Sequence, residues 1–206
     1  MTQASKVSII MLTHNAPSYI RLAVNSLAAH TKDTDYELIV VDNGSRLATR
    51  LLLRQLRRQG KIHKLQLNRE NLLFSRGNNQ GSRLSAPEAT HYLLLNSDVE
   101  IRGDRWLSAL LALCPSGGIS AYGVVRDEPV RADGYCILFD RALYDRYGLD
   151  ERYEWFWSVT KIQAQTLCEG GGVVAVAEHE SMLHHFGGKS GKAFRHAAGM
   201  SEDHAA

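Results

Sequence analysis

Residues 7–15, VSIIMLTHN, decide the fold of this chain. The run from 7 to 13 is continuously apolar and stops at the polar pair His14 and Asn15. Such a run is typical of a strand buried on both faces of a parallel sheet. A helix should follow, because Asn15 is a suitable N-cap and Pro17 falls in the first turn. These residues therefore predict the first strand and helix of an α/β fold.

The same alternation continues through the first half of the chain. Residues 37–42 (ELIVVD) are a second apolar run, and Asn43-Gly44-Ser45 is a typical exit turn. Further strands are predicted over residues 64–67 and 91–95, the last ending at Asn96-Ser97-Asp98, with helices over 47–59 and 75–84 between them. Strands that alternate with helices predict a Rossmann-like, mostly parallel sheet flanked by helices.

The second half has a mixed pattern. It predicts helices over residues 106–113 and 158–168, strands over 119–125 and 135–139, and a short final strand over 173–177 before the segment 182–188 (MLHHFGG). We expect one domain over residues 1–188, made of halves 1–103 and 104–188. Residues 189–206 are small and polar, so we expect a mobile tail.

The charge balance argues against nucleic acid as a partner. The 24 lysines and arginines exceed the 22 acidic residues by only two, so the net charge creates no strong positive electrostatic field. The helix predicted over 47–59 carries Arg50, Arg54, Arg57 and Arg58, which we interpret as a solvated face in preference to a binding patch.

The spacing of the cysteines and the length of the apolar runs indicate in which cellular compartment the protein works. Three widely spaced cysteines fit neither a disulfide framework nor a zinc site. No stretch approaches the roughly 20 apolar residues that a transmembrane helix needs, and the first residues do not form a signal peptide. We expect a cytoplasmic protein without a transmembrane segment, any membrane association being peripheral and at the inner surface.

Polar residues gather where the predicted strands end. Ligands of open α/β sheets bind at the carboxyl ends of the strands. Thr13, Asp42 and Asp98 each close or directly follow a strand of the first half, so their clusters converge on one edge. No G-x-G-x-x-G or Walker sequence follows any strand, which argues against a dehydrogenase or a P-loop nucleotidase. Residues 14–17 also lack the glycine-rich loop that a nucleotidyltransferase would need there.

Four blocks carry a family resemblance. The segments VSIIMLTHN, YELIVVDNGS, ENLLFSRGNNQG and HYLLLNSDVEI, which span roughly the first half, resemble the successive blocks of family 2 glycosyltransferases with the GT-A fold. The resemblance implies a nucleotide-sugar-binding half, 1–103, and an acceptor-side half, 104–188. It implies metal-dependent, hexosyltransferase-like transfer from a UDP, dTDP or GDP sugar to a hydroxyl of a glycan, polysaccharide precursor or lipid-linked acceptor.

By resemblance, specific residues hold the nucleotide. Thr13 and Asn15 lie near it, Asp42 accepts a hydrogen bond from the base, and the segment from Arg76 to Asn78 approaches base and ribose. A carboxylate only accepts hydrogen bonds and so suits an imide or amide N–H, while an arginine suits phosphate.

The same resemblance implies a metal site. Asn96-Ser97-Asp98 resembles the family's Asp-x-Asp motif with Asn96 in place of the first aspartate, and Asp98 keeps the hard oxygen ligand. His184 is the better candidate to complete the site and His185 the reserve. Imidazole suits Mn²⁺ better than Mg²⁺, so we expect manganese.

The general base is missing from its expected place. An inverting transfer needs a group that takes the proton of the acceptor hydroxyl. In the family an acidic residue opens the helix that here begins Trp157-Ser158-Val159, and its position falls on Ser158 or Val159. The nearest acids are Asp150, Glu151 and Glu154.

Three interpretations stay open. Glu154 is a displaced base, which we favour; the reaction needs no base; or the domain binds sugar nucleotides without turnover. The aromatic residues beside Glu154 form either a platform for a sugar face or core packing. They are Tyr153, Trp155, Phe156 and Trp157.

Overall fold

A seven-stranded sheet forms the centre of the protein. The computed structural model describes residues 5–154 and 157–189, and the strand order is β10-β6-β9-β4-β1-β2-β3. Only β9 runs antiparallel to its neighbours, β4 and β6. The strands are β1 (Lys6–Thr13), β2 (Asp35–Asp42), β3 (Lys64–Leu67), β4 (His91–Leu95), β6 (Ile119–Tyr122), β9 (Cys136–Asp140) and β10 (Val173–Val176). The mostly parallel α/β fold is confirmed.

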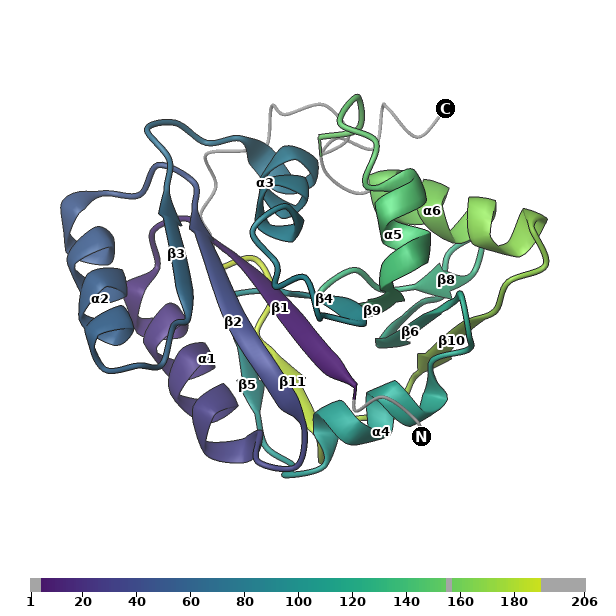
Figure 1. The fold of residues 1–206 in the computed structure, drawn as a ribbon, viewed down its shortest axis with the longest axis horizontal. Helices are drawn as coiled ribbons and strands as arrows, with labels where there is room; N and C mark the ends of the chain where they lie inside the picture. The colour runs from purple at the N-terminus through teal and green to yellow at the C-terminus, as the bar shows by residue number, and fades with distance from the viewer. Residues whose placement is uncertain (1–4, 155–156, 190–206) are drawn as a thin grey trace.

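Helices cover both faces of this sheet (Figure 1). One face carries α1 (Pro17–His30), α2 (Leu47–Arg58) and α4 (Trp106–Leu113), and the other carries α3 (Leu73–Ser82), α5 (Arg141–Tyr147) and α6 (Trp157–Cys168). Because side chains alternate along a strand, Val7, Ile9 and Met11 of β1 join one apolar core and Ile10 joins the other. The continuous apolar run of β1 therefore fills two cores at once.

Two short strands form a second sheet beneath the first. β5 (Val99–Ile101) pairs antiparallel with β11 (Leu183–His185), so that His185 lies opposite Val99. The sequence predicted neither strand, because three residues are too few to show a period of two. Figure 1 shows β11, at the end of the described chain, beside β5 and close to α1.

The first helix begins differently from the prediction. Asn15 is not its N-cap: the cap position is Ala16, which has a φ of 53° and gives no side-chain cap. Asn15 instead joins β1 to the loop after β2. Its N–H donates to Ser45 Oγ over 2.7 Å, and its Oδ1 accepts from the Arg46 N–H over 3.0 Å. The Asn15 side chain, which the sequence pattern predicted as the N-cap of the helix, therefore makes a tertiary contact instead.

The strand predicted over 119–125 is divided at Gly123. After β6 the chain turns into β7 (Val124–Val125), which pairs with β8 (Arg131–Ala132). Gly123 has a φ of 96°, and a Cβ there would lie 2.6 Å from the Tyr135 ring. The break therefore needs glycine, and it turns the β7–β8 hairpin away from the sheet.

The two halves of the chain share the sheet, since β4 pairs with β9 along five residues. The domain limits at 103 and 188 stay predictions. The expected tail, apart from Lys189, and Trp155 and Phe156 lie outside the described residues. Within the described ranges, no helix has the length and apolar character required to cross a membrane.

Candidate functional site

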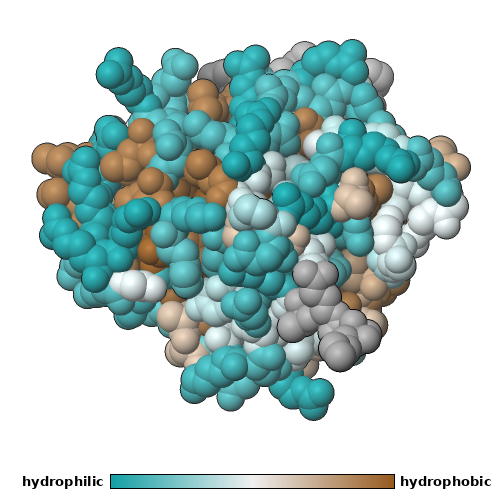
Figure 2. All heavy atoms as spheres, in the orientation of Figure 1, coloured by the Kyte–Doolittle hydropathy of each residue, from teal (hydrophilic) through white to brown (hydrophobic). Residues whose placement is uncertain are grey.

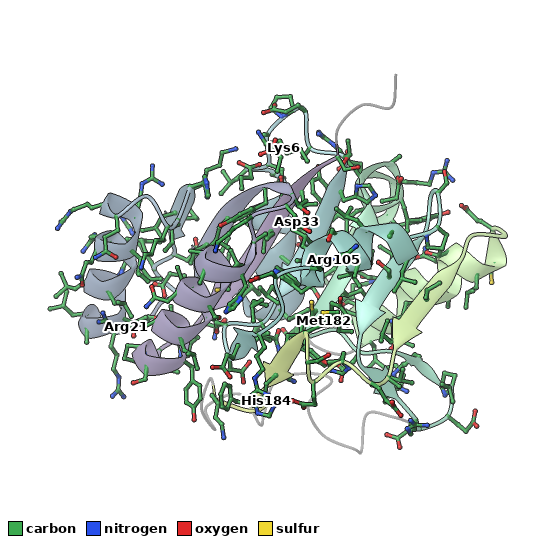
Figure 3. The ribbon with its side chains drawn as sticks, turned by 90° about the horizontal axis from the view of Figure 1, so that it is seen from below. Lys6, Arg21, Asp33, Arg105, Met182 and His184 are labelled. Atoms are coloured by element: carbon green, nitrogen blue, oxygen red, sulfur yellow. The ribbon has the colours of Figure 1, made fainter. Side chains whose placement is uncertain are left out.

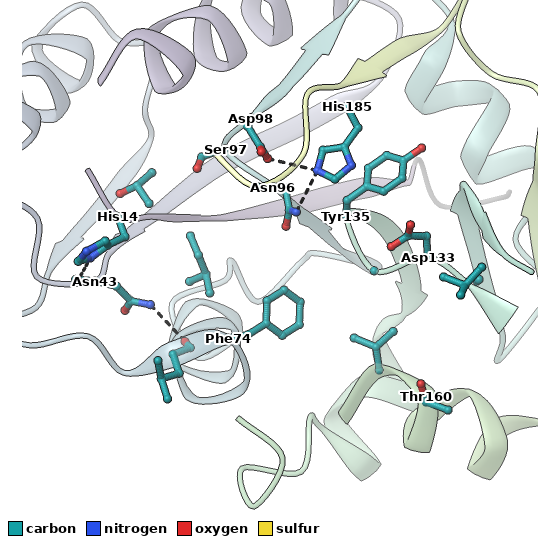
Figure 4. Close-up of a pocket in the computed structure, with 18 of the residues that line it drawn as sticks. His14, Asn43, Phe74, Asn96, Ser97, Asp98, Asp133, Tyr135, Thr160 and His185 are labelled. Carbon is teal, nitrogen blue, oxygen red and sulfur yellow. Dashed lines mark hydrogen bonds and ion pairs between the residues drawn. The ribbon is translucent and has the colours of Figure 1, made fainter. Parts of the chain in front are cut away.

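A cavity of about 400 Å³ opens at the carboxyl edge of the sheet. The chain passes from β1 to β2 on one side, while β4 lies on the other side of β1, so strand order reverses here. The wall comes from the ends of β1, β2 and β4, the start of α3, the β7–β8 hairpin and the first turn of α6 (Figure 4). The fold thus gathers polar residues from both halves around one space.

Asp98 and His185 meet on the wall of this cavity. Asp98 follows β4 and is 6% exposed, and its Oδ1 lies 3.3 Å from His185 Nε2. Asn96 Nδ2 lies 3.4 Å from the same nitrogen, and the backbone N–H of Lys189 donates to Asp98 Oδ2 over 3.3 Å. Figure 4 shows the three side chains together. The structure therefore joins the Asn96-Ser97-Asp98 turn to one of the two candidate histidines.

The surroundings of Asp98 favour its ionised form. Burial alone would raise the pKa of the carboxyl group. The hydrogen bond and charge of His185, with the N–H of Lys189, more than offset burial, and the pKa of Asp98 is lowered. An ionised carboxylate on the wall of a cavity is a ligand for a hard cation.

Tyr135 fixes the ring of His185. The two rings stack with centroids 4.2 Å apart and planes at 18°. The Tyr135 hydroxyl bonds to His179 Nε2, and burial raises the pKa of Tyr135, which keeps the hydroxyl protonated. Tyr135 directly precedes β9, and its carbonyl accepts the Asn96 N–H over 2.8 Å. Sequence reasoning missed this positioning role, because stacking depends on a contact between distant segments.

His184, the first choice for the metal site, does not reach Asp98. Successive side chains of β11 point to opposite sides, and His184 Nδ1 lies 3.0 Å from Glu180 Oε2 instead. Figure 3, which views the molecule from below, labels His184 on β11. The structure therefore places His185, and not His184, beside Asp98, which could not be predicted before the alternation of β11 was known.

Of the residues expected near the nucleotide, Thr13 lines the cavity and Asp42 does not. Asp42 has no exposed surface; its carboxylate accepts from Thr13 Oγ1 and from the Ser45 N–H, each over 3.2 Å. Asp42 and Asn15 therefore brace the ends of β1 and β2 from behind the cavity.

The two residues of α3 that were expected near the nucleotide, Arg76 and Asn78, do not point into the main cavity. Asn78 is 1% exposed, and its amide donates to the Phe74 carbonyl over 3.0 Å. Arg76 is exposed, and its Nε lies 3.7 Å from Glu151 Oε2. Neither lines the main cavity; Leu73 and Phe74 do. A helix distributes neighbouring residues around its axis, so the segment cannot present all of them to one ligand.

His14 and Asn43 also line the cavity. Both belong to the polar clusters that the sequence predicts at this edge of the sheet, although neither residue was predicted to have a binding role of its own. His14 Nδ1 lies 2.7 Å from the Asn43 carbonyl oxygen, and Asn43 Nδ2 donates to the Leu73 carbonyl over 3.2 Å. These contacts tie the ends of β1 and β2 to the start of α3.

The expected position of the base holds no acid. Ser158 is fully buried, and Val159 lines the cavity as an apolar wall. Glu154 lies in a separate cavity of about 180 Å³ with Glu151 and Arg76. Among the described residues, the carboxylates that line the main cavity are Asp98 and Asp133.

The site fits one divalent cation with few protein ligands. The described ranges contain no cluster of three or more His, Cys, Asp or Glu side chains able to hold a metal. Asp98 supplies an oxygen and His185 a nitrogen on the same wall. That pair leaves coordination positions for water or diphosphate oxygens, and its mixed donors suit Mn²⁺.

Comparison with known structures shows similarity to sugar-nucleotide enzymes. The mannosyltransferase PcManGT from Pyrobaculum calidifontis, in complex with GDP-Man and Mn²⁺, is similar with a TM-score of 0.71 and 16% identity, over 86% of this chain and 56% of that one. S. aureus TarS 1-349 in complex with UDP-GlcNAc gives 0.66 and 17%, over 84% and 56%. GalNAc-T7 with UDP, GalNAc and Mn²⁺ gives 0.69 and 14%, over 85% and 43%. At these identities the likeness shows the fold.

Sequence comparison assigns the family. The uncharacterized protein y4gI of Sinorhizobium fredii (strain NBRC 101917 / NGR234) is 30% identical over 118 residues, which are 57% of this chain and 13% of that protein. The chain thus spans a small part of that relative and about half of two of the solved structures. The family described as Glycosyl transferase family 2 matches residues 8–169, most of the chain, and the expected family is confirmed. The chain belongs to glycosyl transferase family 2.

Proposed function

We propose that this protein transfers a sugar from a nucleoside diphosphate sugar to an acceptor hydroxyl in the main cavity. The observation that carries the proposal is the Asp98–His185 pair, at the carboxyl edge of a sheet whose order reverses there. Family membership supports sugar transfer. The bound GDP-Man, UDP-GlcNAc and UDP of the structural neighbours support a nucleotide-sugar donor.

We propose that Asp98 and His185 hold Mn²⁺, with Asn96 beside them. The Mn²⁺ in two of the neighbours supports this assignment over Mg²⁺. When bound, the cation would supply positive charge to the departing diphosphate. The chain's own contribution is geometric: Tyr135 holds the His185 ring, and the N–H of Lys189 orients the Asp98 carboxylate.

We propose that the nucleotide lies against Thr13, His14 and Asn43. Asn15 and Asp42 do not contact the nucleotide but fix the backbone at the ends of β1 and β2 on which it lies. Arg76 and Asn78 do not contact the nucleotide. The base is uracil, thymine or guanine, and the acceptor is a glycan, polysaccharide precursor or lipid-linked glycan on the cytoplasmic side of a membrane. The β7–β8 hairpin and α6 form the wall on which the acceptor would bind.

A second candidate function has its own support. Ser158 and Val159 stand where the family has an acid, which favours a module that binds sugar nucleotides without turnover. Both candidates require the same donor site. They differ in whether another group takes the acceptor proton.

Calorimetric titration with UDP, GDP and dTDP, each with and without Mn²⁺, tests the donor site. We expect one nucleotide to bind in a manganese-dependent manner, and Asp98→Ala to abolish that dependence. If no nucleotide binds, both candidate functions fail. If the Asp98→Ala protein binds as well as the parent, the metal assignment fails.

A further inference from the structure

We propose that Asp133 is the general base of the transfer reaction. This inference rests on the proposed function and deepens it. Asp133 precedes Gly134 and Tyr135 at the start of β9, and it lines the main cavity. Figure 4 shows Asp133 beside Tyr135, across the cavity from His14 and Asn43. The residue thus faces the proposed nucleotide wall from the acceptor side.

The other acids of this region are engaged elsewhere. Asp150 forms ion pairs with Arg152 Nη2 at 2.7 Å and with Lys161 Nζ at 2.5 Å. These hydrogen bonds hold the pKa of Asp150 far below its usual range, so it is a poor proton acceptor.

Glu151 and Glu154 line the smaller cavity behind the start of α3. Glu151 Oε1 accepts from the amide of Asn79 over 3.1 Å and lies 3.6 Å from Arg83. The backbone carbonyl of Glu154 accepts the Phe74 N–H over 3.0 Å, which fixes that loop against α3. Neither side chain lines the main cavity, where the sugar would react.

A backbone hydrogen bond positions Asp133, and its carboxylate stays available to accept a proton because no cationic side chain among the described residues pairs with it. Its N–H donates to the Gly123 carbonyl over 3.0 Å, which ties it to the glycine break between β6 and β7. Within residues 5–154 and 157–189, no lysine, arginine or histidine forms an ion pair with Asp133. Asp98, the second carboxylate of the wall, faces His185 and the proposed metal. The two carboxylates therefore have separate roles.

The proposed step transfers one proton and one sugar. As the acceptor oxygen bonds to the anomeric carbon, Asp133 takes the hydroxyl proton. The bond from that carbon to the diphosphate oxygen breaks, and its electron pair leaves with the diphosphate. Asp133 later releases the proton to water. Because the base acts directly on the attacking oxygen, opposite the leaving group, the transfer inverts the anomeric carbon.

Release of nucleoside diphosphate, with water as acceptor, tests this base. The probes are UDP-glucose, UDP-N-acetylglucosamine, dTDP-glucose and GDP-mannose, each with Mn²⁺. For the donor that is turned over, we expect Asp133→Asn to lower kcat on the order of 100-fold or more, with KM and calorimetric nucleotide affinity unchanged. Asp133→Glu should retain more activity than Asp133→Asn. Asp35→Asn, at the exposed start of β2 and away from the carboxyl edge of the sheet, is the matched control and should behave like the parent.

Two further readouts separate a base from a structural residue. Formate should partly restore turnover to Asp133→Ala, and the Asp133→Asn protein should lose the acidic limb of the pH–rate profile. Full turnover by Asp133→Asn, or loss of turnover in Glu154→Gln instead, would overturn the assignment. Manganese-dependent nucleotide binding without turnover of any donor by the parent would also overturn it, in favour of a binding module. Absence of nucleotide binding marks failure of the proposed function itself.

A second inference comes from the outward face of α2. We define the α2 surface as six exposed residues of this helix and its N-cap, namely Arg46, Leu47, Leu51, Arg54, Arg57 and Arg58. Leu47 is 67% exposed and Leu51 is 53% exposed, one helical turn apart. Figure 2 shows hydrophobic residues gathered at the left of the molecule, over α2 and the β3 edge. The two exposed leucines lie between exposed arginines and form an amphipathic face. In the described part of the chain no helix or strand packs over them.

The charge of this surface has one sign. Eight lysines and arginines and no acidic residue lie between Asp42 and Glu70. In the described part of the chain, no acid forms an ion pair with the four arginines of the α2 surface. The sequence alone favoured a solvated face for Arg54, Arg57 and Arg58, but with the exposed leucines beside them we infer that the α2 surface binds an anionic membrane surface, with leucines inserted among lipids and arginines on phosphate headgroups. Charge complementarity favours this occupant over a second copy of the chain, whose own α2 surface is equally basic.

Co-sedimentation with lipid vesicles tests the α2 surface. The probes are phosphatidylcholine vesicles with and without 30% (roughly one lipid in three) phosphatidylglycerol. We expect binding to the anionic vesicles alone, lost at high salt, and weakened on the order of 100-fold by Arg54→Gln/Arg57→Gln/Arg58→Gln. Leu47→Ser/Leu51→Ser should also weaken it, whereas Leu167→Ser, at an exposed leucine of α6, should not.

Three results would contradict this inference. The first is that the parent does not bind anionic vesicles. The second is equal binding by the parent and the triple arginine variant. The third is self-association in solution that the leucine variant abolishes, which would assign the surface to a second copy.

Discussion

Side-chain placement at His184 and His185 decides which imidazole can serve the proposed metal. The two residues are chemically identical neighbours, yet one contacts Asp98 and the other contacts Glu180. The difference follows from strand alternation in β11. Tyr135 adds a second constraint, because stacking prevents the His185 ring from turning away.

We predict unequal effects of replacing these histidines. His185→Ala should weaken manganese-dependent nucleotide binding by about 10- to 100-fold, because one metal donor is lost. His184→Ala should leave the affinity unchanged and serves as the matched control. Calorimetric titration of both variants measures the difference. If His184→Ala lost more nucleotide affinity than His185→Ala, the sequence-based choice of His184 as the metal ligand would be correct after all.

Glu37 is a buried acid far from the cavity that joins three strands. It is 5% exposed, and Lys64 Nζ of β3 lies 2.8 Å from its Oε2. Ser8 Oγ of β1 and the Ala86 N–H both donate to its Oε1 over 2.6 Å. Burial alone would raise the pKa of Glu37, but these partners outweigh burial and the pKa is lowered below 4.5.

Glu37→Gln should therefore destabilise the protein by about 2 kcal/mol near neutral pH, since a charged hydrogen-bond acceptor is removed. A lowered folded-state pKa stabilises the protein above the unfolded value, near 4.5, and this contribution is lost as the pH falls through the folded value. Urea denaturation at pH 7 and at successively lower pH measures both effects. Glu88→Gln, at the exposed Lys6–Glu88 pair, is the control. Equal stability of Glu37→Gln and parent at pH 7 would contradict the prediction.

At the scale of elements, close packing of α3 on β1 sets the floor of the cavity. A Cβ at Gly81 would lie 2.4 Å from Ile10 Cγ2, so the helix can approach the strand only at a glycine. The same helix presents Leu73 and Phe74 to the cavity. The spacing between α3 and the sheet therefore fixes one wall of the site.

Gly81→Ala should cost about 1–3 kcal/mol, because the added methyl group forces α3 and β1 apart. Urea denaturation measures the loss. The adjacent Ser82→Ala removes a hydroxyl that bonds only within α3, and we expect a change within about 0.5 kcal/mol. A Gly81→Ala protein as stable as Ser82→Ala would show that α3 moves without cost.

At the scale of the whole molecule, the proposed ligand joins the two halves of the chain. Thr13 and Asp98 come from one half, and His185 and Asp133 from the other. A ligand that binds only the folded protein raises its stability by mass action.

With Mn²⁺ and the preferred nucleotide at about 100 times the dissociation constant, we expect Tm to rise by about 5–10 °C. Either component alone should give a smaller shift, and Asp98→Ala should remove the combined effect. Differential scanning calorimetry measures these shifts. A combined shift no larger than the sum of the separate ones would contradict a shared site for metal and nucleotide.

The architecture and one half of the candidate site can be predicted from local features of the sequence. Each buried strand of the first half is a contiguous apolar run whose end can be recognised locally, and the rule for parallel sheets then placed Thr13 and Asp98 on one edge. Burial and periodicity act on neighbouring residues, so these features are encoded locally. The family blocks lie in the same segments, which is why the family was also predictable.

The partners of those residues could not be predicted, because they come from distant segments of the folded chain. The pairing of β11 with β5 selects His185, and the break at Gly123 turns the chain so that Asp133 lines the cavity. Contacts of Asn15 and Asp42 with the loop after β2 removed both from the cavity wall. Each of these outcomes depends on segments far apart in the chain coming into contact, and no local period or propensity specifies such a contact.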